Sequence, residues 1–292
     1  MRVVGIGGGH GLAVTLRAAR FYASDVGAVV TVADDGGSSG RLTRELGVPP
    51  PGDIRNCLVA LADGGELADL YQYRFRRGTL SGHTVGNLVI AALAERMGDF
   101  AGAVAEAGHL LGTKGCVYPA TTALVELHAS TDDGVLRGQV AVAESRAPIR
   151  TVYLEPPDPP AHDGAVRAIA CADQVVLGPG SLFTSLIATL AVPGIAHALS
   201  ASRARRVFVC NARGQAGETH GLSAGEHARA LLEHAGPTCI DSVVVQAPTL
   251  EGGVPVDRGA LEDLGLEVVE ADVATEEGHD PPRLARVLAV LT

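Results

Sequence analysis

Two adjacent carboxylates, Asp34 and Asp35, are the residues of this chain best placed to do chemistry. They follow a short apolar segment, 28–32, that is typical of a buried strand, and a run of Gly and Ser leads from them to Arg41. Flexible glycines and mutually repelling acids weaken a folded core, so the cluster indicates a ligand, and we expect a phosphorylated one. The acids could hold a divalent cation, or one could act as a base. The alternative is a structural helix cap or turn.

Two glycine-rich turns follow strand-like segments and precede helical patterns. The first runs from Gly7 to Gly11 and includes His10, and the second runs from Gly178 to Thr184. Helix N-termini present unpaired N–H groups that bind anions. Two such turns in one sheet suit a nucleotide diphosphate conjugate with two polar ends. Ser181 is not expected to be a hydrolase nucleophile, because the surrounding sequence is not Gly-x-Ser-x-Gly.

A proline-rich approach precedes a third cluster. Asp53, directly after a glycine, is predicted to be a helix N-cap, which places Arg55 and Asn56 in the first turn. An arginine there opposes the helix dipole, so its position needs another reason. Either an anionic ligand or an internal ion pair with Asp34 or Asp35 would supply that reason.

Further polar residues lie at the starts of helices or the ends of strands. His83 and Asn87 are four residues apart on one predicted helical face, where they could orient a ligand or a water molecule. Asn211 follows a predicted parallel strand. His220 and His279 lack zinc-site spacing, so we predict no metal site built from protein ligands alone.

Composition excludes several classes of protein. The net charge of −10 argues against non-specific nucleic-acid binding. Lys114 is the only lysine, so phosphate contacts must come from backbone N–H groups, hydroxyls or arginines. The five cysteines form no Cys-x-x-Cys motif and are expected to be buried, reduced thiols. No leader pattern and no apolar stretch of about 18 residues is present, so we expect a cytoplasmic protein without membrane insertion.

Strand and helix patterns alternate, which predicts an α/β protein with a Rossmann-like, doubly wound, mostly parallel sheet. A turn at 132–134, flanked by strand-like segments 122–128 and 135–143, predicts a small antiparallel excursion near 116–152. We expect residues 1–292 to form a single domain. The predicted strands span 2–6, 28–33, 173–177, 207–210, 242–246 and 266–270. The predicted helices span 11–20, 53–63, 84–97, 99–111, 161–171, 182–191, 223–235 and 282–290.

Taken together, these motifs closely resemble the YvcK-like gluconeogenesis factor family, which is related to CofD, the 2-phospho-L-lactate transferase. The resemblance runs through almost the whole chain. Two long stretches, Thr31–Leu42 and Pro50–Leu61, carry most of its specificity. Shorter matching segments are Gly7–Gly11, Gln72–Phe75, Ser81–His83, Gly86–Asn87 and Gly178–Ser185.

The resemblance implies binding of UDP-sugars such as UDP-N-acetylglucosamine or UDP-glucose. The paired acids suggest Mg²⁺ together with the diphosphate of such a ligand. It also implies a cytoplasmic role in cell shape during gluconeogenic growth, and we expect a homo-oligomer. The chain departs from the family pattern at three places: His10 stands where Thr is usual, Ala-Arg-Gly-Gln follows Asn211 where relatives often have Val-Met-Thr-Gln, and Gly278 stands where an Arg often precedes the terminal His-Asp pair. The candidate ligand-binding residues are Gly7, Gly8, Gly9, His10, Gly11, Asp34, Asp35, Ser38, Ser39, Gly40, Arg41, Asp53, Asn56, His83, Asn87, Gly178, Gly180, Ser181, Thr184 and Asn211.

Two functions of different classes stay open. One is a nucleotide-sugar-binding regulator without turnover and hence without catalytic residues. The other is a transferase that moves a phosphorylated small acid from a nucleotide diphosphate to an acceptor hydroxyl, with Asp34 or Asp35 holding Mg²⁺ or activating the acceptor. The signature at 31–42 favours the regulator. A low aromatic content of 3% leaves few stacking surfaces for a flavin-like acceptor. An NAD site explains the chain less well, because it needs one ribose-binding acid rather than two.

Overall fold

A seven-stranded parallel sheet organises the chain in the computed structural model, which describes residues 1–291. Its strand order is β10-β9-β8-β7-β1-β2-β3, so the first three strands run to one edge and the later ones to the other. The predicted doubly wound α/β class is confirmed. The strands are β1 (Arg2–Gly7), β2 (Asp25–Val30), β3 (Cys116–Pro119), β7 (Gln174–Leu177), β8 (Arg205–Val209), β9 (Ser242–Gln246) and β10 (Glu267–Ala271).

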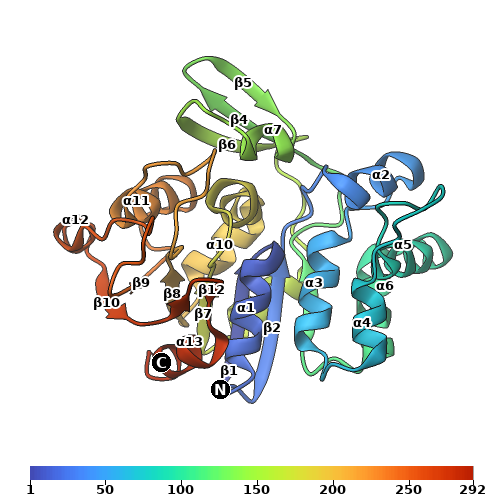
Figure 1. The fold of residues 1–292 in the computed structure, drawn as a ribbon, viewed down its shortest axis with the longest axis horizontal. Coiled ribbons are helices and arrows are strands. Elements are labelled where there is room, and N and C mark those ends of the chain that lie inside the picture. Colours follow the sequence, from blue (N-terminus) through green and yellow to red (C-terminus); the bar gives the residue numbers. More distant parts are fainter. Residues whose placement is uncertain (292) are drawn as a thin grey trace.

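Helices cover both faces of this sheet (Figure 1). Alternate residues of β1 point to opposite cores, because side chains of a strand alternate between its two faces: Val3 joins one cluster, and Val4 and Ile6 join the other. The core around Val3 is covered by α1 (Gly9–Ala19), α3 (Gly52–Leu61), α5 (Val85–Met97), α6 (Phe100–Leu111) and α13 (Pro281–Leu288). The opposite core is covered by α8 (Asp163–Cys171), η1 (Leu182–Ile187), α9 (Ala188–Leu190), α10 (Pro193–Ala201) and α11 (Ala224–Ala235).

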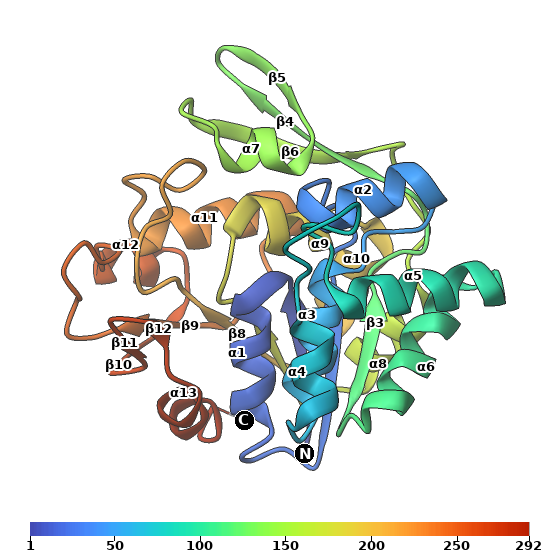
Figure 2. The same cartoon turned by 45° about the vertical axis from the view of Figure 1, so that its right-hand side comes forward.

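A small antiparallel sheet stands at one end of the main sheet, above the carboxyl ends of its central strands (Figure 2). We call residues 126–155 the antiparallel cap; it comprises β4 (Glu126–Thr131), β5 (Gly134–Arg137), α7 (Gln139–Ala143) and β6 (Ile149–Glu155). The excursion was predicted to begin near residue 116, but β3 pairs in parallel with β2 and belongs to the main sheet. Segment 135–143 was predicted as one strand, but its second half is the helix α7, which buries Val142.

Helix α2 (Gly37–Leu46) replaces the flexible loop expected after the paired acids. The strand predicted at 28–33 ends at Val30, and the chain then crosses to α2. Glycines lower helix propensity, but Leu42 is 4% exposed and joins the core, so tertiary packing outweighs propensity here. The Gly-Gly-Ser-Ser-Gly run therefore has a fixed conformation whose serines are buried.

Several shorter elements had no clear sequence signal. Helices α4 (Glu66–Gln72), α10 and α12 (Arg258–Asp263) and the two-stranded pair β11 (Ala274–Thr275) and β12 (Gly278–His279) were not predicted. The helix predicted at 182–191 begins as the π-helix η1. Cys116 and Cys171 are exposed, which corrects the expectation of buried thiols for these two.

Within residues 1–291, no single helix is long and apolar enough to cross a membrane. Two consecutive helical segments are long and apolar enough only when they are counted together, Leu182–Leu190 and Pro193–Ala201. The chain bends by 77° between them.

Candidate functional site

The two glycine-rich turns meet at the point where the strand order of the sheet reverses. One follows β1 and the other follows β7, and these strands are neighbours in the sheet. A β-carbon on Gly11 would overlap the carbonyl oxygen of Pro179 and lie 2.7 Å from the α-carbon of Gly180. Only glycine permits this backbone-to-backbone contact. In doubly wound sheets, the reversal point is where ligands bind.

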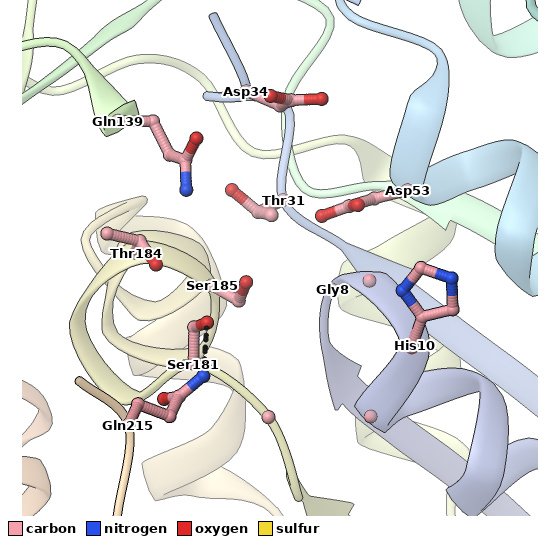
Figure 3. Close-up of a pocket in the computed structure, with 13 residues that line it drawn as sticks. Gly8, His10, Thr31, Asp34, Asp53, Gln139, Ser181, Thr184, Ser185 and Gln215 are labelled. Carbon is pink, nitrogen blue, oxygen red and sulfur yellow. Dashed lines mark hydrogen bonds between the residues drawn. The ribbon is translucent and has the colours of Figure 1, made fainter. Parts of the chain in front are cut away.

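A cleft of about 300 Å³ opens between these turns. Figure 3 shows Gly8, His10 and Asp53 on one side, Ser181, Thr184 and Ser185 on the other, and Gln139 reaching in from the antiparallel cap. The cleft is lined by Gly8, Gly9, His10, Gly11, Thr31, Asp34, Asp53, Gln139, Gly180, Ser181, Thr184, Ser185 and Gln215.

Asp53 lies at the N-terminus of α1, where the helix presents its unpaired N–H groups. A β-carbon on Gly8 would overlap Oδ2 of Asp53, so glycine is required for this approach. The predicted N-cap role is wrong, because α3 begins at Gly52 and Asp53 makes no capping hydrogen bond. The carboxylate instead faces the cleft from the first turn of α3. Burial, reinforced by the charge of Asp34, raises the pKa of Asp53 to about 7.

Asp34 faces the same cleft from the segment between β2 and α2. Its Oδ1 accepts a hydrogen bond of 3.0 Å from the Gly36 amide. Burial raises the pKa of Asp34, although hydrogen bonds from Ser39 and Gly36 partly oppose this effect. Ser39 also accepts a hydrogen bond from the Gly52 amide at 3.1 Å, which links the two acidic segments. Asp34 and Asp53 thus form a pair of cleft carboxylates with raised pKa values.

A cation in this cleft would need oxygen ligands from a bound molecule. Among residues 1–291, no cluster of three or more His, Cys, Asp or Glu side chains is placed to hold a metal ion. Mg²⁺ characteristically binds one or two carboxylates together with phosphate oxygens and water. Asp34 and Asp53 fit that incomplete set, and a cation would stabilise the ionised carboxylates whose pKa values burial raises.

Asp35 points away from Asp34 and contacts the antiparallel cap. Its Oδ1 accepts a hydrogen bond of 3.0 Å from the Val140 amide in the first turn of α7. A carboxylate in this position stabilises a helix N-terminus. Asp35 therefore fastens the cap to the main body and does not line the cleft.

A buried polar network lies behind the acids. Arg55, 5% exposed, donates to Thr84 Oγ1 at 2.6 Å, Asn87 Oδ1 at 2.8 Å and Asn56 Oδ1 at 2.8 Å. Within residues 1–291, no carboxylate lies within ion-pair distance of Arg55, so the proposed ion pair with Asp34 or Asp35 is wrong. The amides and hydroxyl disperse the guanidinium charge instead.

Ser38 joins this network to the loop before α5. Its Oγ lies 3.0 Å from Nδ1 of His83 and accepts a hydrogen bond of 3.1 Å from Asn87. Helix α5 starts at Val85, so His83 precedes the helix rather than sharing a helical face with Asn87. Arg41 donates to the Ser81 carbonyl at 2.8 Å. These side chains hold α2 against α5.

The second glycine turn differs from the phosphate cradle predicted from its sequence. The Gly180 amide donates to Asn211 Oδ1 at 2.9 Å, and the Thr184 amide donates to Glu218 Oε2 at 3.0 Å. Gln215 donates to Ser181 Oγ at 3.0 Å. Side chains of the protein therefore already use two backbone donors that a phosphate would need.

The structure brings together about half of the residues predicted for the ligand site. Gln139 and Gln215 line the cleft without having been predicted, because no local motif marks a single glutamine that a distant loop carries to a site. Thr31 and Ser185 lie in predicted motifs but were not named as site residues. Asn211 lines a neighbouring cavity that shares Gln215 with the cleft. The predicted residues that do not line the cleft are Gly7, Asp35, Ser38, Ser39, Gly40, Arg41, Asn56, His83, Asn87, Gly178 and Asn211.

Comparison with known proteins places this geometry in context. Residues 3–274 match the family described as 2-phospho-L-lactate transferase CofD. The chain is 40% identical over 304 residues to the gluconeogenesis factor of Bacillus subtilis, with 98% of this chain and 96% of that protein covered. It is 42% identical over 255 residues to the gluconeogenesis factor of Halalkalibacterium halodurans, with 86% and 79% covered. A crystal structure of a UPF0052 family member from Bacillus halodurans matches with a TM-score of 0.95, 38% identity and 98% coverage of both chains.

Proposed function

Because the chain belongs to the CofD family and is similar throughout to its gluconeogenesis factors, we propose that it binds a UDP-sugar in the cleft between α1 and η1 as a regulator. The observation that carries the proposal is the position of the cleft. It lies at the reversal point of the sheet, with the N-terminus of α1 on one side and hydroxyl and amide side chains on the other.

The diphosphate would lie against the N-terminus of α1. Gly8, Gly9 and Gly11 carry no side chains of their own at that end of the helix, so phosphate oxygens can approach its N–H groups beside the Asp53 carboxylate, which accepts a hydrogen bond from the Gly9 amide. Asp34 and Asp53 would repel a bare diphosphate. We therefore propose that the ligand binds with Mg²⁺, and that the two carboxylates and the ligand's phosphate oxygens would hold this ion together.

A regulatory role fits the relatives, which are named as gluconeogenesis factors. We propose that the protein acts in the cytoplasm and relays the supply of UDP-N-acetylglucosamine or UDP-glucose to processes that set cell shape during gluconeogenic growth. The side chains of the cleft support binding: Gln139, Ser181 and Gln215 are hydrogen-bonding groups without strong nucleophilic character.

A transferase is the second candidate, and the raised pKa of Asp53 is the observation that favours it. A carboxylate with a pKa of about 7 can accept a proton from an acceptor hydroxyl near neutral pH. In that case Asp53 would be the base, whereas Asp34 would hold the cation. Incubation of the protein with UDP-N-acetylglucosamine, Mg²⁺ and an acceptor alcohol, followed by detection of released uridine nucleotide, separates turnover from binding.

The binding test is thermal unfolding with UDP-N-acetylglucosamine, UDP and NAD, each with Mg²⁺ or with a chelator. A ligand at about one hundred times its dissociation constant adds about 2.7 kcal/mol to the free energy of unfolding. This corresponds to an increase of at least about 5 °C in the Tm of a chain of this size. We expect the increase with UDP-N-acetylglucosamine and Mg²⁺ and not with NAD. No increase with either uridine ligand would refute the proposed function.

A further inference from the structure

The two walls of the cleft are chemically different. The α1 wall carries a helix N-terminus and faces the acids Asp34 and Asp53. The opposite wall, which we call the η1 wall, carries the uncharged side chains of Ser181, Thr184, Ser185 and Gln215 (Figure 3). A ligand that spans the cleft therefore meets different chemistry at its two ends.

Glu218 lies behind the η1 wall and closes the N-terminal end of the π-helix. This side chain is 7% exposed, and its Oε2 accepts the hydrogen bond from the Thr184 amide. Burial raises the pKa of Glu218, although the hydrogen bond that it accepts from the Thr184 amide opposes this effect. An internal carboxyl group therefore fills the position where a helix N-terminus would otherwise receive an anion.

Two backbone donors of the η1 wall are therefore already used. Asn211 accepts a hydrogen bond from the Gly180 amide, and Glu218 accepts one from the Thr184 amide. A phosphate or carboxylate placed there would find these donors used and an acidic side chain behind them. Like charges brought together in a desolvated site repel strongly, so this wall disfavours an anionic group.

The same wall is well suited to hydroxyl groups. Thr184, which is 2% exposed, has a buried Oγ1 with no hydrogen-bond partner among residues 1–291. Ser181 and Ser185 add hydroxyls that both donate and accept. Gln215, hydrogen-bonded to Ser181, adds an amide to the wall. Neutral donors and acceptors at this density match a polyhydroxylated group.

We infer that the η1 wall is the subsite for the uncharged sugar of the nucleotide sugar, and that Glu218 makes this subsite reject anions. Glu218 is then a specificity-determining residue that acts through the Thr184 amide rather than by touching the reacting or binding atoms. This inference rests on the proposed function, because it presupposes that a nucleotide diphosphate occupies the α1 wall.

The first test compares ligands on the unmodified protein and needs no variant. Isothermal titration with Mg²⁺ and UDP-glucose, UDP-glucuronate or UTP keeps the uridine diphosphate and varies the group attached to it; UDP-glucuronate differs from UDP-glucose only in the carboxylate of the sugar. We expect UDP-glucose to bind at least ten times more tightly than UDP-glucuronate or UTP. Equal affinity for the three would overturn the inference and leave the proposed function standing. No binding of any of them would instead refute the proposed function.

The second test assigns the selectivity to Glu218. In Glu218→Gln, the side-chain oxygen can still accept from Thr184, but the negative charge is lost. We expect the ratio of UDP-glucose affinity to UTP affinity to fall at least tenfold, mainly because UTP binds more tightly. Glu233→Gln, the same change at an exposed residue of α11, is the matched control and should leave the ratio unchanged. A ratio that is unchanged in a folded Glu218→Gln protein would refute the role of Glu218.

Discussion

Gly8 and Asp53 are packed so closely that the absence of a side chain on the first allows the carboxylate of the second to lie at the start of α1. The two residues are 45 positions apart: Gly8 lies in the turn after β1, and Asp53 lies in the first turn of α3. Their contact joins a helix N-terminus to an acid with a raised pKa. The consequences of this contact for binding and stability can be measured.

Gly8→Ala should abolish ligand binding. Its β-carbon would overlap Asp53 Oδ2 and lie 2.8 Å from Thr31 Cγ2, so the turn must move away from the cleft. The increase in Tm caused by UDP-N-acetylglucosamine and Mg²⁺ should disappear. Gly259→Ala is the control, because a β-carbon there meets no atom within 4 Å. A Gly8→Ala protein that keeps the full increase would show that this turn does not bind the diphosphate.

Asp53→Asn should stabilise the free protein above neutral pH. The pKa of Asp53 is raised to about 7 in the folded state, so the folded protein holds a proton that the unfolded chain releases above about pH 4. The stability supplied by that proton is present at low pH and is lost as the pH rises toward 7. Asparagine removes this dependence.

The free energy of unfolding of Asp53→Asn should therefore exceed that of the unmodified protein by on the order of 1–2 kcal/mol at pH 8, with little difference at pH 4.5. Urea denaturation in metal-free buffer at the two pH values measures this difference. An advantage of the variant that is largest at pH 4.5 would contradict the assigned direction of the pKa shift. The variant should also lose Mg²⁺-dependent ligand binding.

Asp34 and Asp35 should differ in their effects despite being neighbours. Asp34→Asn removes a cleft carboxylate and should weaken ligand binding in Mg²⁺ at least tenfold, a change of about 1.4 kcal/mol. Asp35→Ala removes the acceptor for the Val140 amide and should lower the free energy of unfolding by about 1 kcal/mol, as loss of a helix cap does. Ligand titration and urea denaturation of both variants test this division. The assignment of Asp34 to binding and of Asp35 to stability is wrong if Asp35→Ala weakens binding as much as Asp34→Asn does.

Arg55→Met should destabilise the protein by about 2 kcal/mol, because it leaves the buried oxygens of Asn87 and Thr84 without their donor. Urea denaturation gives the difference. Arg76→Met, at an exposed arginine, supplies the control and should change the free energy of unfolding little. A loss no larger than that of the control would mean that water replaces the guanidinium in the network.

The fold could be predicted from the sequence where hydrophobic patterns were long. Apolar runs such as 242–246, together with helices between them, were enough for the parallel sheet. Helix α2 could not be predicted, because glycine-rich sequence disfavours a helix and only the burial of Leu42 outweighs that tendency. β3 could not be assigned to the main sheet, because its four residues, which end in Pro119, form no continuous buried apolar run of the kind that marks β7.

The site could be predicted in part, because glycine-rich turns and acids at strand ends have local signatures. Gly8, Gly11 and Asp34 were found in this way and line the cleft. Glu218 could not be found, because its position depends on a loop that folds back against η1, 34 residues away along the chain. Asp35 has the same local signature as Asp34, but its side chain hydrogen-bonds the Val140 amide of the antiparallel cap and does not line the cleft.

The central position of β1 also has a consequence for how the chain is made. One edge of β1 pairs with β2 soon after synthesis, but its other neighbour, β7, lies more than 160 residues later. At about 5–20 residues per second, a ribosome needs roughly ten to thirty seconds to supply that partner. For that interval the nascent chain carries an open strand edge containing Val3, Val4 and Ile6. A newly made chain is therefore prone to aggregate through this unpaired strand edge until β7 is synthesised. The cleft can form only after the second half of the chain has left the ribosome.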